Sequence, residues 1–139
     1  MTKRVLLVCM GNICRSPAAE AVLRVHAPHL TLDSAGTGAW HIGLPPDPRA
    51  LAEGARRGYR YGDLRARKIA PADFASFDLI LAMDRQNLAD IAATAPPGAT
   101  ATRALFLGEA EVPDPYYDNS FARMFDLIET RARELAAIL

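Results

Sequence analysis

The residues best suited to chemistry lie in residues 5–17, VLLVCMGNICRSP, which place Cys9 six positions before Arg15. The first four of these residues are apolar and predict a short buried strand, after which a loop begins at Cys9. Ser16 suits a helix N-cap and Pro17 the first helical position, so a helix should follow directly. The pattern therefore gathers a thiol, a guanidinium, several backbone N–H groups and a helix N-terminus in one small volume.

Each of these features favours a bound anion. A helix N-terminus presents unpaired N–H groups, and a curled loop forms a nest of backbone donors. The planar fork of Arg15 matches two oxygens of a tetrahedral oxyanion. A thiol in such surroundings loses its proton readily, so we interpret Cys9 as a nucleophile at the base of a phosphate-sized pocket. The alternative makes Cys9 a small buried apolar residue and Arg15 a surface charge.

The loop itself is expected to surround a phosphate group. Its residues are Met10, Gly11, Asn12, Ile13 and Cys14, with Ser16 following Arg15. The Ser16 hydroxyl can hydrogen-bond the sulfur as well as cap the helix. A curled loop could also bring Cys14 within disulfide distance of Cys9. We hypothesise a reversible oxidation that spares Cys9 from further damage, with an inert packed thiol as the alternative.

Hydrolysis of a phosphate monoester needs an anionic nucleophile, charge stabilisation around the transferred phosphoryl group and an acid for the leaving oxygen. Cys9 can supply the first, and Arg15 with the loop N–H groups the second. Asp114 is the candidate acid, because Pro113 and Pro115 stiffen the loop around its carboxyl group. It would act first as acid and then as base, through a phosphocysteine and without a metal. The alternative is a turn residue, since Asp-Pro commonly starts a turn.

Composition places the chain among ordinary globular proteins of one domain, spanning residues 1–139. Its 16 basic and 16 acidic residues balance, which argues against nucleic acid or anionic membranes as partners. No apolar run approaches the roughly 20 residues of a membrane span, and the N-terminal one is too short for a signal peptide. The two cysteines and the required thiolate indicate a reducing cytoplasm. His26, His29 and His41 show no metal-ligand spacing, so no metal or other cofactor is expected.

Apolar runs and helical periodicity alternate along the chain. Strands are predicted at residues 5–8, 31–34, 78–83 and 102–107, and helices at 18–26, 47–58, 71–77, 84–94 and 119–139. Asp47 and Asp84 are predicted as helix caps. The alternation favours a parallel sheet built from βαβ units with right-handed crossovers. Ligands bind such sheets beyond the carboxyl ends of the strands, where Cys9 is placed.

Three segments resemble the low-molecular-weight protein tyrosine phosphatases: CMGNICRSP at 9–17, DSAGT at 33–37 and DPYYDNS at 114–120. The resemblance runs along essentially the whole chain, in the same order. It implies an α/β fold of the phosphatase I-like type, with three α/β/α layers and a central four-stranded parallel sheet of order 2-1-3-4. It also implies hydrolysis of phosphotyrosine, with the catalytic residues in the first and third segments.

The resemblance assigns further roles. It implies that the Ser34 hydroxyl braces Asn12 and that an aromatic residue of the 36–47 loop lines the substrate cleft. Relatives often carry histidine where this chain has Leu64, which removes any hydrogen bond that such a histidine would make. The implied partners are phosphotyrosine-containing proteins, with inorganic phosphate or vanadate as inhibitors, and we expect a monomer.

Trp40, Tyr116 and Tyr117 are the candidate walls of that cleft. Trp40 could stack on an aromatic ring, although it could equally pack its loop onto the body of the protein. The two tyrosines could flank an aromatic leaving group and select phosphotyrosine over the shorter phosphoserine. Their alternative role is loop or core packing.

Other functions are compatible with parts of this pattern. An arsenate-reductase-like thiol enzyme would share the phosphate loop but needs a further cysteine outside it, and the chain has none. A non-catalytic phosphate or phosphopeptide reader would not need Cys9, Arg15 and Asp114 together. Among the phosphatases, a protein arginine phosphatase branch carries threonine where this chain has Ile13. The apolar Ile13 side chain suits a phenol ring, so phosphotyrosine is favoured.

Overall fold

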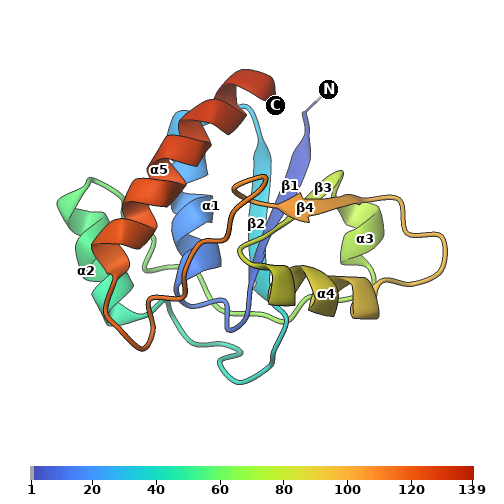
Figure 1. Cartoon of the computed structure of the whole chain (residues 1–139), viewed down its shortest axis with the longest axis horizontal. Helices are drawn as coiled ribbons and strands as arrows, with labels where there is room; N and C mark the ends of the chain where they lie inside the picture. Colours follow the sequence, from blue (N-terminus) through green and yellow to red (C-terminus); the bar gives the residue numbers. More distant parts are fainter. Residues whose placement is uncertain (1) are drawn as a thin grey trace.

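A computed structural model of the chain describes residues 2–139. Its elements are β1 (Arg4–Cys9), α1 (Arg15–His26), β2 (Thr31–Gly36), α2 (Pro48–Arg56), α3 (Asp73–Ser76), β3 (Leu79–Ala82), α4 (Arg85–Thr94), β4 (Thr102–Leu105) and α5 (Phe121–Ile138). The four strands pair in parallel as one sheet in the order β2-β1-β3-β4 (Figure 1). This confirms the predicted α/β class and strand order.

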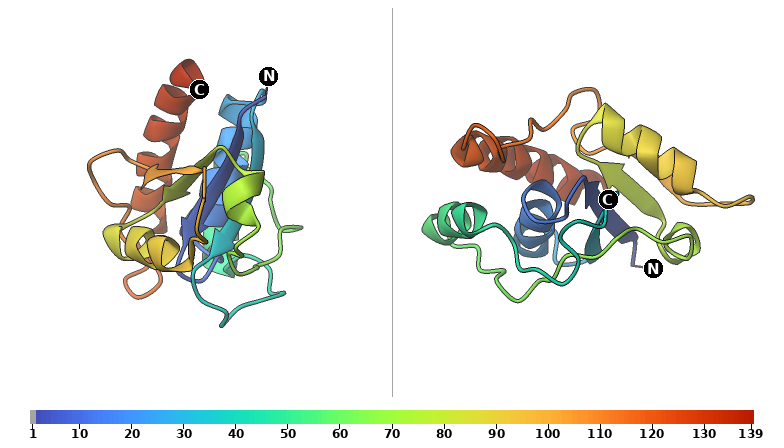
Figure 2. Two further views of the ribbon diagram at one scale, coloured as in Figure 1. Left: turned by 90° about the vertical axis from the view of Figure 1, so that its right-hand side faces the viewer. Right: turned by 90° about the horizontal axis from the view of Figure 1, so that it is seen from below.

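Helices cover both faces of the sheet. α1, α2 and α5 lie on one face, and α3 and α4 lie on the other (Figure 2). Side chains of β1 alternate between the two sides: Val5 and Leu7 join the apolar cluster with α1 and α5, whereas Leu6 and Val8 join the cluster with α3 and α4. All four are fully buried, as a central parallel strand requires. The architecture is therefore the predicted three-layer sandwich.

The carboxyl end of β1 lies at the topological switch point of the sheet. β2, the next strand in the sequence, pairs with one edge of β1, and β3 pairs with the other. The end of β2 supports the loop that begins there. Gly36 pairs with Cys9, and a Cβ at position 36 would lie 2.7 Å from the carbonyl oxygen of Met10. The amides of Thr37 and Gly38 donate to the carbonyl oxygens of Cys9 and Met10 at 2.9 and 3.0 Å. A larger residue at position 36 would therefore displace the loop.

Three sequence predictions at this loop are wrong. Cys9 is the last residue of β1 rather than the first of the loop. α1 begins at Arg15, with Cys14 at the N-cap and no side-chain cap, so Ser16 is not the N-cap and Pro17 is not the first helical residue. The Ser16 hydroxyl is instead engaged within the loop. Pro17 still lies in the first turn, where its missing N–H costs no intrahelical hydrogen bond.

The remaining boundaries differ from the predictions by one or two residues at the element ends. Both predicted caps are confirmed: the Asp47 side chain accepts from the Arg49 amide at the start of α2, and Asp84 accepts from the Asn87 amide at the start of α4. Capping is decided by local sequence, which is why these two starts could be predicted accurately.

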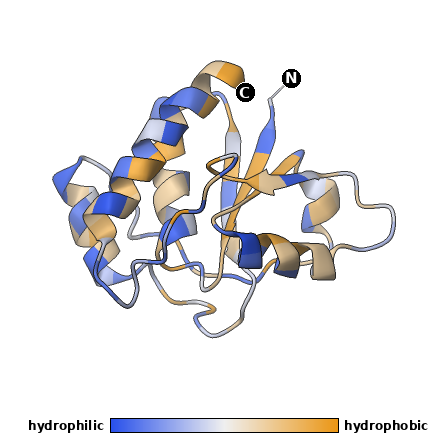
Figure 3. Ribbon diagram, in the orientation of Figure 1, coloured by the Kyte–Doolittle hydropathy of each residue, from blue (hydrophilic) through white to orange (hydrophobic). Residues whose placement is uncertain are grey.

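The last helix, α5, buries an apolar stripe whose residues recur every three or four positions. Phe121, Phe125, Ile128, Ala132 and Leu135 are all buried against the body of the protein. Figure 3 shows mostly hydrophobic residues along β1, and both hydrophilic and hydrophobic residues on α5. None of the helices formed by residues 2–139 combines the length and the apolarity needed to cross a membrane.

Candidate active site

The loop after β1 curls around the Cys9 sulfur. The Asn12 amide donates to Cys9 Sγ at 3.3 Å, and the Ser16 hydroxyl oxygen lies 3.0 Å from the same atom. Asn12 has a φ of 57°, in the left-handed region that asparagine tolerates better than most residues, and this turns the loop back over the sulfur. The sulfur therefore lies among donors, in a setting that stabilises a thiolate.

The Asn12 side chain holds this loop from behind. Its Nδ2 donates to Ser16 Oγ at 2.8 Å and to Ser34 Oγ at 3.1 Å, and its Oδ1 accepts from the Arg67 amide at 3.0 Å. The bond to Ser34 is the contact that the family resemblance implies. The Leu64 side chain packs against the larger apolar cluster and takes no part in this hydrogen-bond network. The side-chain amide of Asn12 therefore has all its hydrogen-bonding groups engaged without a histidine at position 64.

This arrangement determines where the Ser16 proton goes. Because the Ser16 oxygen accepts from Asn12, its own hydrogen is free to be donated. Two acceptors are available, Cys9 Sγ at 3.0 Å and the Ala35 carbonyl oxygen at 3.4 Å. Sulfur is the larger atom and is also the nearer acceptor, so the geometry favours donation to the sulfur. Such a donor stabilises negative charge on Cys9.

Arg15 is held from one side and open on the other. Its side chain is only 2 % exposed, and Nη1 donates to Asp84 Oδ2 at 2.7 Å and to the Val112 carbonyl oxygen at 3.0 Å. Burial alone would lower the pKa of Arg15, but the nearby Cys9 sulfur and the Asp84 carboxylate raise it above its ordinary value. Nε and Nη2 form no hydrogen bond with residues 2–139, so a fixed cation faces the pocket with donors to spare.

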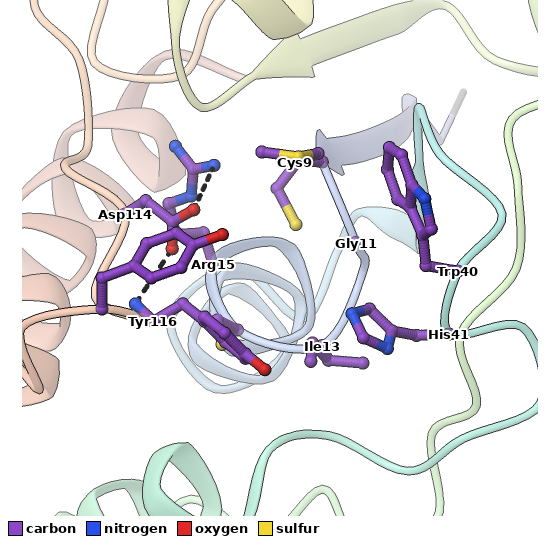
Figure 4. Close-up of a pocket in the computed structure, with 11 residues that line it drawn as sticks. Cys9, Gly11, Ile13, Arg15, Trp40, His41, Asp114 and Tyr116 are labelled. Carbon is purple, nitrogen blue, oxygen red and sulfur yellow. Dashed lines mark hydrogen bonds and ion pairs between the residues drawn. The ribbon is translucent and has the colours of Figure 1, made fainter.

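Asp114 enters the same pocket from the loop before α5 (Figure 4). Its Oδ2 lies 3.7 Å from Arg15 Nη2, and its Oδ1 accepts from the Tyr116 amide at 3.0 Å. The carboxyl side chain is 30 % exposed, so it is oriented by the loop while remaining accessible from solvent. A carboxyl group that is both oriented and accessible can exchange a proton with a group bound in the pocket.

Aromatic side chains form the upper walls of this pocket of about 380 Å³. Trp40 and His41 stand on one side, opposite Tyr116 and Asp114 (Figure 4). Trp40 is 71 % and Tyr117 84 % exposed, so neither packs its loop against the core. The other lining residues are Cys9, Met10, Gly11, Ile13, Cys14 and Arg15. The remaining predicted site residues, Asn12, Ser16 and Ser34, lie behind the loop and do not line the pocket.

Comparison with known proteins agrees with this geometry. A family model described as low molecular weight phosphotyrosine protein phosphatase matches residues 4–139. The chain belongs to this family. A low molecular weight phosphotyrosine protein phosphatase of Schizosaccharomyces pombe is 47% identical over 136 residues, covering 86% of each chain.

Solved structures of family members superpose closely on this phosphatase. YfkJ from Bacillus subtilis has a TM-score of 0.91 at 36% identity, covering 99% of this chain and 94% of its own. Vibrio vulnificus Wzb in complex with benzylphosphonate has a TM-score of 0.92 at 31% identity, covering 100% of both chains. The three-layer fold is therefore shared along the whole chain.

Cys14, the second cysteine of this phosphatase, lines the same pocket as the first. Both thiols are free and buried, and both contribute to the pocket lining. Burial raises the pKa of the Cys14 thiol well above its ordinary value, and the negative charges of Asp47 and Cys9 raise it further. Cys14 is therefore a protonated thiol at neutral pH, in contrast to the donor-rich setting of Cys9.

Sequence reasoning missed three residues at the site of this phosphatase. Asp84 was predicted only as a cap, yet it also accepts from Arg15. His41 packs against Gly11 so closely that a Cβ there would lie 2.8 Å from His41 Cδ2. The Arg67 amide supports Asn12 from 55 positions away. Of these three residues, only Asp84 could have been found from the sequence. It is a helix cap directly after a strand of a parallel sheet, which places it at the same sheet edge as Cys9.

Proposed function

We propose that this protein is a phosphatase that hydrolyses phosphotyrosine in proteins, and small aryl phosphates, through a phosphocysteine and without a metal. The observation that carries the proposal is that Cys9, Arg15 and Asp114 line one pocket, with the Arg15 guanidinium 3.7 Å from the Asp114 carboxylate. A nucleophile, a cation and an acid on one side of a pocket are the minimum set for phosphoryl transfer.

In the first step the Cys9 thiolate attacks phosphorus, an S–P bond forms, and the P–O bond to the phenol breaks. The Asp114 carboxyl group donates its proton to the departing oxygen, so the leaving group is a neutral phenol. The free Arg15 donors and the loop amides stabilise the equatorial oxygens as charge redistributes. Because Asp84 and Val112 hold Nη1, the guanidinium is pre-oriented before substrate arrives.

In the second step water attacks the phosphocysteine. Asp114, now a carboxylate, accepts a proton from that water, inorganic phosphate forms, and the S–P bond breaks. The electron pair returns to sulfur, where the Ser16 hydroxyl and the Asn12 amide stabilise the leaving thiolate. The two groups that favour attack by a thiolate in the first step therefore favour its departure in the second.

The walls of the pocket support an aromatic substrate. Ile13 offers an apolar surface, and Trp40 and Tyr116 lie on opposite sides of the pocket (Figure 4). The relative Wzb was solved in complex with benzylphosphonate, an aromatic ring joined to a phosphonate. A phosphoserine side chain is shorter and lacks a ring that these walls could contact.

The same chemistry sets the conditions under which the protein works. Inorganic phosphate and vanadate carry the tetrahedral oxygens that the loop binds, so we propose them as competitive inhibitors. Cys9 must remain a free thiol, which supports a reducing compartment such as the cytoplasm. We propose a monomer of one domain, because the proposed catalytic groups all come from a single chain.

An assay of the purified protein tests this proposal. With EDTA present at pH 5 to 7, we expect vanadate-sensitive release of phosphate from phosphotyrosine peptides and from aryl phosphates. Phosphoserine and phosphoarginine peptides, run in parallel, should react at least about tenfold more slowly. A preference for phosphoarginine would transfer the assignment to the arginine phosphatases, and absence of any hydrolysis would leave only phosphate binding.

We also propose that oxidation regulates the site. Peroxide would convert the Cys9 thiolate to sulfenic acid, and the Cys14 thiol would then attack that sulfur, forming a disulfide and releasing water. The first reaction removes the negative charge on Cys9, which is one cause of the raised pKa of Cys14.

Recovery of activity after oxidation distinguishes a reversible Cys9–Cys14 disulfide from irreversible oxidation of Cys9. Wild-type enzyme treated with peroxide should regain most of its activity in dithiothreitol, whereas Cys14→Ser should lose a larger share irreversibly, measured against its own untreated rate. Equal recovery in both proteins would show that Cys14 gives no protection.

A further inference from the structure

Arg49, in the first turn of α2, bridges two parts of the site that are far apart in the sequence. Its Nε and Nη2 donate to Asp47 Oδ1 and Oδ2 at 3.1 and 2.9 Å, a paired contact with one carboxylate. Its Nη1 donates to the Tyr116 carbonyl oxygen at 3.2 Å and to Asn119 Oδ1 at 2.6 Å. All three guanidinium nitrogens are therefore in use, which only the planar fork of arginine allows.

One end of this bridge is attached to the phosphate loop. The Asp47 amide donates to the carbonyl oxygen of Ile13 at 2.8 Å, and the Asp47 carboxylate caps α2 through the Arg49 amide. Asp47 is only 7 % exposed, so its position is set by the surrounding protein. The carboxylate that holds Arg49 is thus fixed relative to the loop around Cys9.

The other end is attached to the segment that carries Asp114. The Tyr116 amide donates to Asp114 Oδ1 at 3.0 Å, while the carbonyl oxygen of the same residue accepts from Arg49. The guanidinium carbon also lies 5.3 Å from the centre of the Tyr116 ring and 4.9 Å from that of Phe121. Tyr116 therefore transmits the position of Arg49 to the carboxyl group.

Few other hydrogen bonds hold this segment in place, although Pro115 within it is buried. Within the described part of the chain, the hydrogen bonds that reach residues 113–119 from a distant element all come from Arg49. The remaining bonds are local, such as the Asn119 amide to the Pro115 carbonyl oxygen at 3.0 Å. The ion pair between Asp114 and Arg15 is longer, at 3.7 Å. Without Arg49 the segment would keep the buried Pro115 but would lose its hydrogen bonds to a distant element.

We propose that Arg49 is a positioning residue, which fixes the Asp114–Tyr116 segment above the phosphate loop so that the carboxyl group faces the leaving oxygen. This inference rests on the proposed function. Arg49 does not line the pocket and acts through Asp114, so its contribution should appear only where proton donation matters. That condition separates a positioning role from a general loss of structure.

The test compares two substrates with different demands on the acid. Phenyl phosphate needs a proton on its leaving oxygen, whereas 4-nitrophenyl phosphate releases a stabilised phenolate and needs it less. For Arg49→Ala we expect kcat/KM with phenyl phosphate to fall about 10- to 100-fold, the effect of a misplaced catalytic group. The fall with 4-nitrophenyl phosphate should be only on the order of threefold.

Three further variants sharpen the comparison. In an Asp114→Asn background, Arg49→Ala should cost no more than about a further twofold, because the acid it positions is already absent. Arg49→Lys keeps the charge over the rings but not the fork, so it should restore only part of the loss. Arg56→Ala, in the same helix and paired only with Glu53 among residues 2–139, is the matched control and should behave as wild type.

The outcomes are distinct. Equal losses with both substrates, or equal losses with and without Asp114, would make Arg49 a structural residue and overturn the inference. Inhibition by inorganic phosphate, unchanged within about threefold, checks that the phosphate loop of Arg49→Ala is intact. A wild-type protein that hydrolyses neither aryl phosphate would refute the proposed function instead.

Discussion

Replacing Cys9 with serine should abolish turnover of aryl phosphates, lowering kcat by about 10⁴-fold or more, while vanadate still binds. A serine hydroxyl is not ionised at neutral pH, so the Asn12 amide and the Ser16 hydroxyl would have no anion to stabilise. The oxyanion donors on Arg15 and the loop would remain. Steady-state kinetics together with calorimetric titration of vanadate measure both effects on one preparation.

Alkylation of the wild-type protein provides an independent check of the nucleophile. Iodoacetate at pH 6 should modify Cys9, identified by peptide mass, and should inactivate the enzyme in parallel. Cys14 should remain unmodified, because burial raises the pKa of its thiol. Substantial turnover by Cys9→Ser, or labelling of Cys9 only in alkaline buffer, would remove the proposed nucleophile and with it the mechanism.

Replacing Asp114 with asparagine should lower kcat for phosphotyrosine by about 10²- to 10³-fold with little change in KM. The amide has the size of the carboxyl group, and its oxygen can still accept from the Tyr116 amide, so the loop should keep its conformation. It cannot donate a proton to a phenolate or accept one from water. Both steps of the proposed reaction are therefore impaired, while substrate binding by Arg15 is retained.

The matched control for this change lies in the same loop. Asp118 accepts hydrogen bonds from the backbone amide and the hydroxyl of Ser120 and does not line the pocket. Asp118→Asn should therefore keep kcat within about twofold of wild type. If Asp114→Asn proved as active as Asp118→Asn, the acid would have to be sought elsewhere in the site.

The strand–loop–helix unit at the start of the chain could be predicted because its determinants are local. Four apolar residues specify the strand, and Cys9 and Arg15 lie at the two ends of the short loop that follows it. The start of α1 was predicted too late in the sequence. Ser16 has a side chain that commonly caps helices, but its hydroxyl group instead contacts Cys9 and Asn12. A polar residue with two competing uses cannot be assigned from neighbouring sequence alone.

The amino-acid sequence by itself determined the alternation of strands and helices, the caps at Asp47 and Asp84 and the buried stripe of α5. Each depends on spacing or on neighbours within a few positions.

Only the tertiary structure decided that Arg15 meets Asp84 and that Arg49 meets Tyr116, partners 69 and 67 positions apart. A parallel sheet brings loops from distant strands to one edge, where side-chain length and direction select the partners. No pattern in the linear sequence predicts which of these distant side chains become partners.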